Sequence, residues 1–238
     1  MTVINAAQAG YKELNEQIRR VKNCTVEGCL GQRFLGAGMS DKKITLTGTA
    51  GNAAGAYLNG AEIYIRGNAQ DALGDTMNGG KIVVYGNVGD AAGYAMRGGA
   101  IYVKGNAGYR AGIHMKAYKD KVPVLVIGGK TGSFLGEYQA GGIIIVLNTG
   151  EEKEIVGNFP CTGMHGGAML LRSDCKGIIF PENVRAAAAD QEKLKPFLPY
   201  IAEFCALFGF KAEKILNSPF TLVLPDSNNP YKQMYVIN

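Results

Sequence analysis

The chain of 238 residues has no tryptophan, only two histidines and five cysteines, which leaves few side chains for metal or redox chemistry. The cysteines are odd in number, irregularly spaced and without a C-x-x-C pair, so neither zinc nor an iron–sulfur cluster has a local ligand set. We therefore expect free thiols in a reducing compartment and no metal bound by this chain.

Targeting and membrane segments are missing as well. The N-terminal residues lack the basic start and the apolar stretch of a secretory signal peptide. No apolar run approaches the roughly 20 residues that span a bilayer. The net charge of +5 is mild, and the basic residues are scattered instead of gathered into a stripe. These absences favour a cytoplasmic protein that binds neither a membrane nor nucleic acid.

Motifs for nucleotide binding and hydrolysis are incomplete. GGKT at 128–131 ends like a phosphate-binding loop, but the first glycine of that motif would have to occupy the position of Val124. No G-x-G-x-x-G lies between a strand and a helix, and no G-x-S-x-G supplies a nucleophilic serine. We predict no catalytic residue in this chain and no activity of the chain alone.

Glycine, in contrast, is abundant, and many of the 34 glycines follow a 19-residue repeat. The repeat reads ITLTGTAGNAAGAYLNGAE at 44–62, IYIRGNAQDALGDTMNGGK at 63–81 and IVVYGNVGDAAGYAMRGGA at 82–100, and it begins again at Ile101. A unit this short cannot bury its own apolar face and has to stack on its neighbours, which predicts a solenoid.

Each unit opens with a short strand of alternating apolar residues and continues with the spacing G-x-x-G-x-x-x-G. Glycine permits tight corners and close backbone approach, so each unit becomes one coil of a right-handed parallel β-helix. A Leu or Met three residues after the last glycine is expected to point inward, as at Met96. The predicted turn glycines are Gly48, Gly51, Gly55, Gly67, Gly74, Gly86, Gly89, Gly93, Gly105, Gly108, Gly112, Gly129, Gly132 and Gly136.

The two ends of the chain carry a different pattern. Apolar residues at helical spacing predict a short helix within 10–22 and a stronger one over 190–208, with Asp190 as its N-cap and Gly209 as its stop. We expect the second helix to cap the open end of the solenoid, with docking to a partner as the alternative. FTLVL at 220–224 is a candidate closing strand.

The stretch 148–167 interrupts the pattern and is predicted to be an irregular excursion from the coils. The sequence as a whole divides into three parts. The parts are an N-terminal helical lead-in at 1–27, a β-helix of glycine repeats at 28–180, and a C-terminal helix and closing strand at 181–238.

One coil carries more large polar and aromatic side chains than the others. The segment GYRAGIHMKAYKDK at 108–121 decorates the repeat with Tyr, Arg, His and Lys. A rigid coil that presents such a cluster suggests contact with a partner. The interface candidates are Tyr109, Arg110, His114, Lys116 and His165, of which the last lies in a similar glycine-rich context, GMHGG.

The repeat, together with the strings GDAAGYAMRGG, GYRAGIHMK, FLGEYQAGGIIIVL and TGMHGG, resembles the C-terminal β-helix domain of the glutamate synthase large subunit in its stand-alone, archaeal-type form. In that family the β-helix supports a glutaminase module and a synthase module. The resemblance implies a noncatalytic scaffold subunit in a hetero-oligomer that makes glutamate from glutamine and 2-oxoglutarate. It implies that FMN and iron–sulfur clusters reside in the partner subunits and that no cofactor is bound by this chain.

Other parent complexes remain open. The repeat also resembles one of the subunits of formylmethanofuran dehydrogenase, a molybdenum or tungsten enzyme, and one of those of N-methylglutamate synthase. From a different class, an independent ligand-binding β-helix would use a lateral groove. Tyr64, Tyr85 and Tyr102 alternate along the coils, but no ladder of carboxylates accompanies them.

Overall fold

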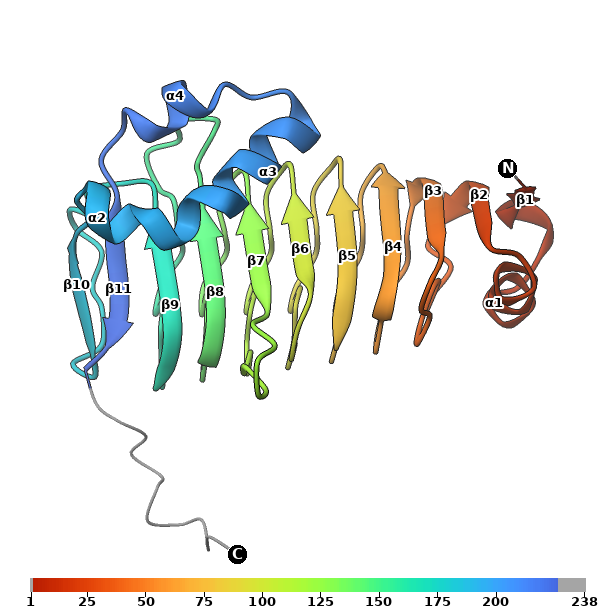
Figure 1. The fold of residues 1–238 in the computed structure, drawn as a ribbon, viewed down its shortest axis with the longest axis horizontal. Helices are drawn as coiled ribbons and strands as arrows, with labels where there is room; N and C mark the ends of the chain where they lie inside the picture. Colours follow the sequence, from red (N-terminus) through yellow and green to blue (C-terminus); the bar gives the residue numbers. More distant parts are fainter. Residues whose placement is uncertain (1, 227–238) are drawn as a thin grey trace, which may run out of the picture.

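The structure, a computed structural model, describes residues 2–226, which form one continuous solenoid (Figure 1). The predicted parallel β-helix is confirmed, as a β-solenoid of about eight turns with helices near both ends. The strands follow one another along the axis in sequence order until the last two. They are β1 Thr2–Asn5, β2 Asn23–Leu30, β3 Lys43–Thr49, β4 Asn59–Arg66, β5 Gly79–Val84, β6 Ala100–Val103, β7 Val124–Ile127, β8 Ala140–Val146, β9 Gly166–Leu171, β10 Val184–Ala188 and β11 Thr221–Pro225.

The 19-residue repeat sets the register of the sheet. β3 and β4 pair in parallel with Ile44 opposite Ile63, and β4 and β5 pair with Ile63 opposite Ile82. Each residue therefore lies beside its equivalent in the next repeat. Because successive side chains in a strand point to opposite faces, one set of equivalent residues forms ladders that point into the solenoid.

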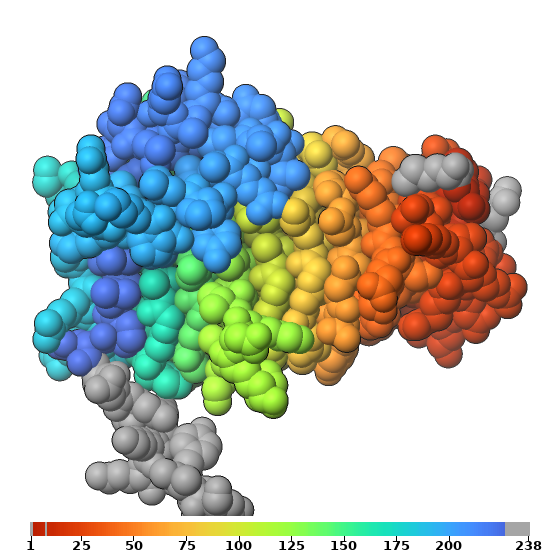
Figure 2. All heavy atoms as spheres, viewed as in Figure 1, coloured from red at the N-terminus to blue at the C-terminus, as the bar shows by residue number. Residues whose placement is uncertain are grey.

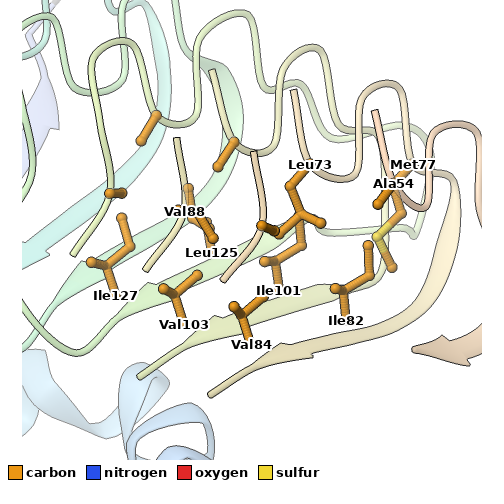
Figure 3. Packing of buried hydrophobic residues seen from close by; sticks show 14 of the residues in the cluster. Ala54, Leu73, Met77, Ile82, Val84, Val88, Ile101, Val103, Leu125 and Ile127 are labelled. Atoms are coloured by element: carbon orange, nitrogen blue, oxygen red, sulfur yellow. The ribbon is translucent and has the colours of Figure 1, made fainter. Parts of the chain in front are cut away.

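These inward ladders make the core. Ile82, Ile101 and Leu125 stand in register and are fully buried, and a second ladder of branched side chains runs beside them (Figure 3). The sequence also predicted an inward Leu or Met three residues after the last glycine of each coil. That prediction is confirmed, since each of these side chains is 0% exposed: Leu58, Met77, Met96 and Met115.

The remainder of each coil consists of turns instead of further long strands. Single bridges join Ala50 to Ala69 and Ala69 to Val88 along the axis. Side chains extend the ladder, because Asn68 Oδ1 accepts the N–H of Asn87 at 2.8 Å. Backbone groups at the corners thereby gain partners where no strand continues. We call these stacked segments the turn wall: residues 29–39, 48–58, 67–77, 86–96, 105–115, 129–139 and 155–164.

The last segment of the turn wall differs from the prediction. An irregular excursion was predicted over 148–167, but most of this stretch is a regular coil. Phe134 N–H donates to Asn158 O at 2.8 Å and Tyr138 N–H donates to Thr162 O at 2.7 Å, as equivalent residues do in earlier coils. Cys161 takes the place of the corner glycine with a φ of 61°. The coil was hidden because this cysteine interrupts the glycine spacing.

The N-terminal helix, α1 Tyr11–Arg19, forms within the predicted stretch and covers the first coil. Leu14 and Ile18 are its buried residues. Lys42 Nζ donates to three carbonyl groups at the C-terminal end of the helix, those of Ile18, Arg19 and Val21, at 2.7 to 3.0 Å. The sheet starts upstream of the predicted boundary at residue 28, because β1 already pairs with β2 in parallel.

The C-terminal part adds α2 Gln191–Leu194, a 3₁₀ turn at Lys195–Phe197, α3 Leu198–Phe208 and α4 Ala212–Leu216. The predicted boundaries are confirmed: Asp190 accepts the N–H of Lys193, and Gly209 ends α3 with a left-handed φ of 76°. The predicted closing strand is β11, which pairs antiparallel with both β9 and β10. None of the helices within residues 2–226 is long and apolar enough to cross a membrane.

The position of the long helix differs from the expected one. α3 lies against the outer face of the sheet near β7 and its neighbours, not across the open end, which β11 and β10 close (Figures 1 and 2). Phe204 and Ile201 pack there against outward side chains such as Val126. The outer face of these strands is apolar, and packing α3 on it removes that surface from water. Residues 227–238 of the predicted C-terminal part lie outside the described residues.

One carboxylate fastens α3 to the sheet. Glu203 accepts the O–H of Tyr102 at 2.6 Å and pairs with Lys81. Burial acts to raise the pKa of Glu203, but the hydrogen bonds from Lys81 and Tyr102 outweigh it and hold that pKa below its usual range. Burial, together with the hydrogen bond to Glu203, raises the pKa of Tyr102. The helix is thus tied to β5 and β6 by a polar contact beside its apolar one.

Candidate functional site

Each coil of the turn wall has two corner positions in the left-handed backbone region, two residues before and two residues after its last glycine. Side chains at these positions leave the coil toward solvent. For residues other than glycine this conformation costs roughly 1–2 kcal/mol. In the coils of repeats 44–62, 63–81 and 82–100 the first corner holds only alanine: Ala53, Ala72 and Ala91.

From Ile101 onward every corner except Gly163 carries a large side chain. Before it, the large corner residues are Phe34 (φ 59°) and Tyr57 (φ 55°). The first corner holds Arg110 (φ 57°), Phe134 (φ 62°) and Phe159 (φ 58°), and the second holds His114 (φ 56°) and Tyr138 (φ 51°). Bulky residues with positive φ are outliers, and such outliers gather at functional sites because the surrounding structure has to hold them. The change of residue type therefore marks this part of the turn wall as a candidate site.

These side chains touch one another from coil to coil. The rings of His114 and Tyr138 are stacked with centroids 5.3 Å apart, and Tyr94 meets His114 edge-on at 5.9 Å. The Arg110 guanidinium lies 4.8 Å from the centre of the Phe134 ring, whose centroid is 5.4 Å from that of Phe159. We call this surface the corner stripe: Tyr94, Arg110, His114, Phe134, Tyr138 and Phe159.

The corner stripe is accessible and rigid at once. Phe159 is 63% exposed, and Tyr94 and Tyr138 are each 39% exposed. Arg110 Nε is held by Glu137 Oε2 at 3.0 Å, which fixes the guanidinium over the aromatic ring of Phe134. Exposed aromatic and arginine side chains that are already ordered are the kind that anchor protein–protein interfaces.

The sequence candidates fall partly on this surface. Arg110 and His114 belong to the corner stripe, and Tyr109 is 53% exposed next to Arg110, with its N–H donated to Asp90 Oδ1 at 2.7 Å. Lys116 is exposed on the same coil. Their role in an interface stays a prediction.

His165 does not occupy the coil position of His114. Tyr138 is the equivalent of His114, and Gly163 is the equivalent of Tyr138, because the hydrogen bonds from the N–H groups of His114 and Tyr138 to Glu137 and Thr162 step along the wall. His165 is half-buried just before β9, with Nδ1 3.0 Å from Gly163 O. The shared glycine-rich context of the two histidines therefore does not place them at equivalent points of the wall.

Phe134, Tyr138, Phe159 and Tyr94 were missed from the sequence. Their signal was present: GSFLG and GNFPC put phenylalanine at the same place in two coils, two residues after a turn glycine. Recognising it requires the last coil to be aligned, which Cys161 obscured. A search for large residues where the repeat elsewhere has alanine would have found them.

A cleft of about 540 Å³ lies where the corner stripe ends. It is lined by 153–160, at the start of the last coil, and by 173–174 and 176–179 from the loop after β9. Phe159 belongs to both the stripe and the cleft, so the two surfaces are continuous. The charges of the lining are mixed, with Lys153 and Lys176 beside Glu154 and Asp174.

The cysteine thiols, which the sequence predicts to be free, are buried. All five are free and buried, and burial raises the pKa of Cys29 to about 11 and that of Cys161 to about 12. These two thiols stay protonated at neutral pH, which removes the thiolate needed for nucleophilic or metal-binding chemistry. Within residues 2–226, no group of three His, Cys, Asp or Glu is placed to hold a metal ion.

The geometry defines a class of protein: a parallel β-solenoid with glycine corners, which presents ordered side chains along one corner of its coils. The chain belongs to the GXGXG motif family, whose model matches residues 3–226. It is also similar to an uncharacterized protein of Methanocaldococcus jannaschii, with 43% identity over an alignment that covers 98% of this chain and 95% of the relative.

Proposed function

We propose that this chain is a noncatalytic scaffold subunit of a glutamate synthase, the complex that makes glutamate from glutamine and 2-oxoglutarate. In this proposal it holds a glutaminase subunit and an FMN and iron–sulfur synthase subunit in register in the cytoplasm. The cofactors belong to the partner subunits. Membership of the GXGXG motif family and the resemblance to the C-terminal domain of the large subunit support the choice of complex.

The observation that carries the scaffold role is the corner stripe. Five large side chains there occupy left-handed positions, whereas the first corner of repeats 44–62, 63–81 and 82–100 has alanine, and each such position has a backbone cost of roughly 1–2 kcal/mol. The coil geometry imposes this φ on alanine as well, at Ala53, Ala72 and Ala91, so folding explains the backbone conformation but not the choice of large side chains that reach solvent there. Burial of the same rings against a partner would recover about 25 cal/mol for each Å² of apolar surface removed from water.

The solenoid suits this role mechanically. Its strands are hydrogen-bonded along the whole axis, from β1 to β9 and on to β11 and β10, so the distance between two docked partners is set by the number of coils. Neighbouring strands are about 4.8 Å apart. A rigid spacer of this kind fixes how two modules face each other, which a transfer of ammonia between them requires.

The experiment that tests the proposal is affinity purification of the tagged chain from its source cells, with identification of the bound subunits and a visible absorption spectrum. The expected result is recovery of a glutaminase subunit together with a yellow-brown flavin and iron–sulfur subunit. Recovery with a molybdopterin or tungstopterin subunit would replace the proposal by the formylmethanofuran dehydrogenase type. A colourless chain without partners would contradict the scaffold role and favour an independent ligand-binding β-helix.

A further inference from the structure

The two walls of the solenoid end at different points. The sheet continues past the last coil, because β9 pairs with β8 and then with β11, which pairs with β10. The turn wall ends at 155–164, although the chain continues into the loop at 173–183. That loop turns inward: Cys175, Ile178 and Phe180 pack against the core. The interior is thereby sealed, whereas within residues 2–226 no further coil covers the backbone edge of the turn wall.

In each earlier coil the same backbone groups are paired with the coil that follows. Thr131 N–H donates to Ile155 O at 3.0 Å, and Phe134 N–H donates to Asn158 O at 2.8 Å. Val156 and Phe159 are the equivalents of Thr131 and Phe134 in the last coil. Among residues 2–226, neither of their N–H groups has an acceptor within hydrogen-bond distance.

The matching acceptors are also open. Gly157 N–H donates to Thr131 O at 3.1 Å, and Cys161 N–H donates to Leu135 O at 2.8 Å. The equivalent carbonyl groups one coil later are those of Val156 and Pro160, and within the described part of the chain neither accepts a donor. Two N–H donors and two carbonyl acceptors are thus unpaired at the positions where each earlier coil bonds to the next one. Unpaired backbone groups of this kind form a template for another chain.

Only one position of this edge is filled from within the described chain. Met164 O accepts the side-chain amide of Asn183 at 2.5 Å, where the earlier coils have a backbone N–H at the same place, such as His165 N–H on Gln139 O at 2.9 Å. The rest of the edge faces the cleft of about 540 Å³. This volume lies in the range of binding pockets in general.

We propose that the cleft binds an extended segment of a partner protein, which pairs with Val156 and Phe159 as one further rung of the turn wall. Main-chain hydrogen bonds give the affinity in such strand addition, and the exposed ring of Phe159 provides an apolar contact for one side chain of the segment. The lining carries two lysines and two carboxylates, so a segment without net charge fits it. The inference does not depend on which complex the chain joins.

The test uses the full chain and a synthetic peptide with the sequence of residues 130–139, KTGSFLGEYQ, a segment that pairs with the last coil on its other side. Binding is measured by fluorescence anisotropy of a labelled peptide, and site occupancy by amide exchange at Val156 and Phe159. The matched control is the same peptide N-methylated at its first glycine, the donor expected to reach Val156 O. We expect saturable binding, slower exchange at both amides, and at least a tenfold loss of affinity on methylation.

Side-chain variants provide a second control. Phe159→Ala should weaken peptide binding at least tenfold, while Phe34→Ala, the equivalent corner at the other end of the wall with a φ of 59°, should leave it unchanged. Equal binding of the methylated and unmodified peptides would overturn the pairing. Slow exchange of the Val156 and Phe159 amides before any peptide is added would also overturn the proposal. If this protection rises with protein concentration, the occupant is a second copy of the chain. If it does not depend on protein concentration, the occupant is a part of the same chain.

Discussion

The imidazole ring of His114 lies parallel to the phenol ring of Tyr138 in the next coil, with 5.3 Å between centroids and 10° between planes. Neither ring is needed for the core, because both project from left-handed corners of the turn wall. Each ring limits the rotation of the other, which leaves less side-chain entropy to lose when a partner binds. This pair is therefore the most direct place to test the scaffold role.

His114→Ala and Tyr138→Ala should leave folding intact and weaken assembly. Removing a preordered aromatic anchor at the centre of an interface costs about 1–3 kcal/mol, which corresponds to roughly a fivefold to 150-fold loss of affinity. The melting temperature should move little, since both side chains are outside the core. The measurement is subunit affinity with the purified partners, alongside a thermal melt of each variant.

Tyr57→Ala is the matched control for this pair. Tyr57 occupies the same corner of an early coil, with a φ of 55° and 58% exposure, but lies outside the corner stripe. Its removal should not change assembly. If all three variants assemble like the natural protein, the corner stripe is not the interface.

Met96→Asp should destabilise the fold. Met96 is 0% exposed in the ladder of inward Leu and Met residues, so the carboxylate would have no water and no partner. We expect a loss of about 4 kcal/mol or more, and a fall in melting temperature of about 10 °C or more. Met96→Leu keeps the volume and should cost less than about 1.5 kcal/mol. A Met96→Asp protein that melts like the natural one would show that the inward assignment is wrong.

The repeat is what made the fold predictable from sequence. A fixed 19-residue period places each residue beside its equivalent, so the inward positions of Ile82 and Met96 follow from periodicity without knowledge of the long-range contacts. The same logic failed in the last coil, because Glu154 and Cys161 replace two of its three turn glycines and leave only Gly157. The helix boundaries at Asp190 and Gly209 could also be predicted, because a helix cap depends only on residues a few positions away in the sequence.

Neither the position of α3 nor the composition of the corner stripe could be predicted from the repeat or from local signals. Whether a helix covers the end or the flank depends on which outward faces are apolar, and Tyr102 gave no sign of being buried until Glu203 was placed beside it. The stripe depends on contacts between residues of different coils, such as Arg110 with Phe134. Such pairs appear only when the last coil and the segment AYKDKVP at 117–123, which lengthens the link between the wall segment 105–115 and β7, are correctly aligned.

Gly48→Ala should be much more harmful than Gly38→Ala. Both glycines have positive φ, 102° and 65°, but a Cβ on Gly48 would lie 2.3 Å from the carbonyl oxygen of Cys29, whereas a Cβ on Gly38 meets nothing within 4 Å. The second variant suffers only backbone strain, about 1–2 kcal/mol. The first adds a collision with backbone between stacked coils, so we expect about 3 kcal/mol or more. Denaturant unfolding of the two variants measures the difference, and equal losses would mean that the close approach of the coils is not limiting.

The link between Glu203, Lys81 and Tyr102 should make the attachment of α3 depend on pH. Because the pKa of Glu203 in the folded chain is held below its unfolded value near 4.5, its contribution is fully present above that value and is lost as pH falls through the folded pKa. Tyr102 acts in the opposite direction. Its pKa is raised, so the contribution of its O–H is complete below about pH 10 and is lost as pH rises through the raised value.

Thermal melts of the natural chain and Glu203→Gln across pH 3 to 8 check the acidic limb. The natural chain should be the more stable at pH 7, and the difference should shrink steadily below pH 4.5 as the carboxylate takes up a proton. Glu192→Gln is the control, because Glu192 pairs with Lys195 on the same C-terminal segment but is exposed, where an ion pair contributes at most about 1 kcal/mol. If Glu203→Gln and Glu192→Gln follow the same pH profile, Glu203 does not fasten the helix, and apolar packing around Phe204 alone holds α3 on the sheet.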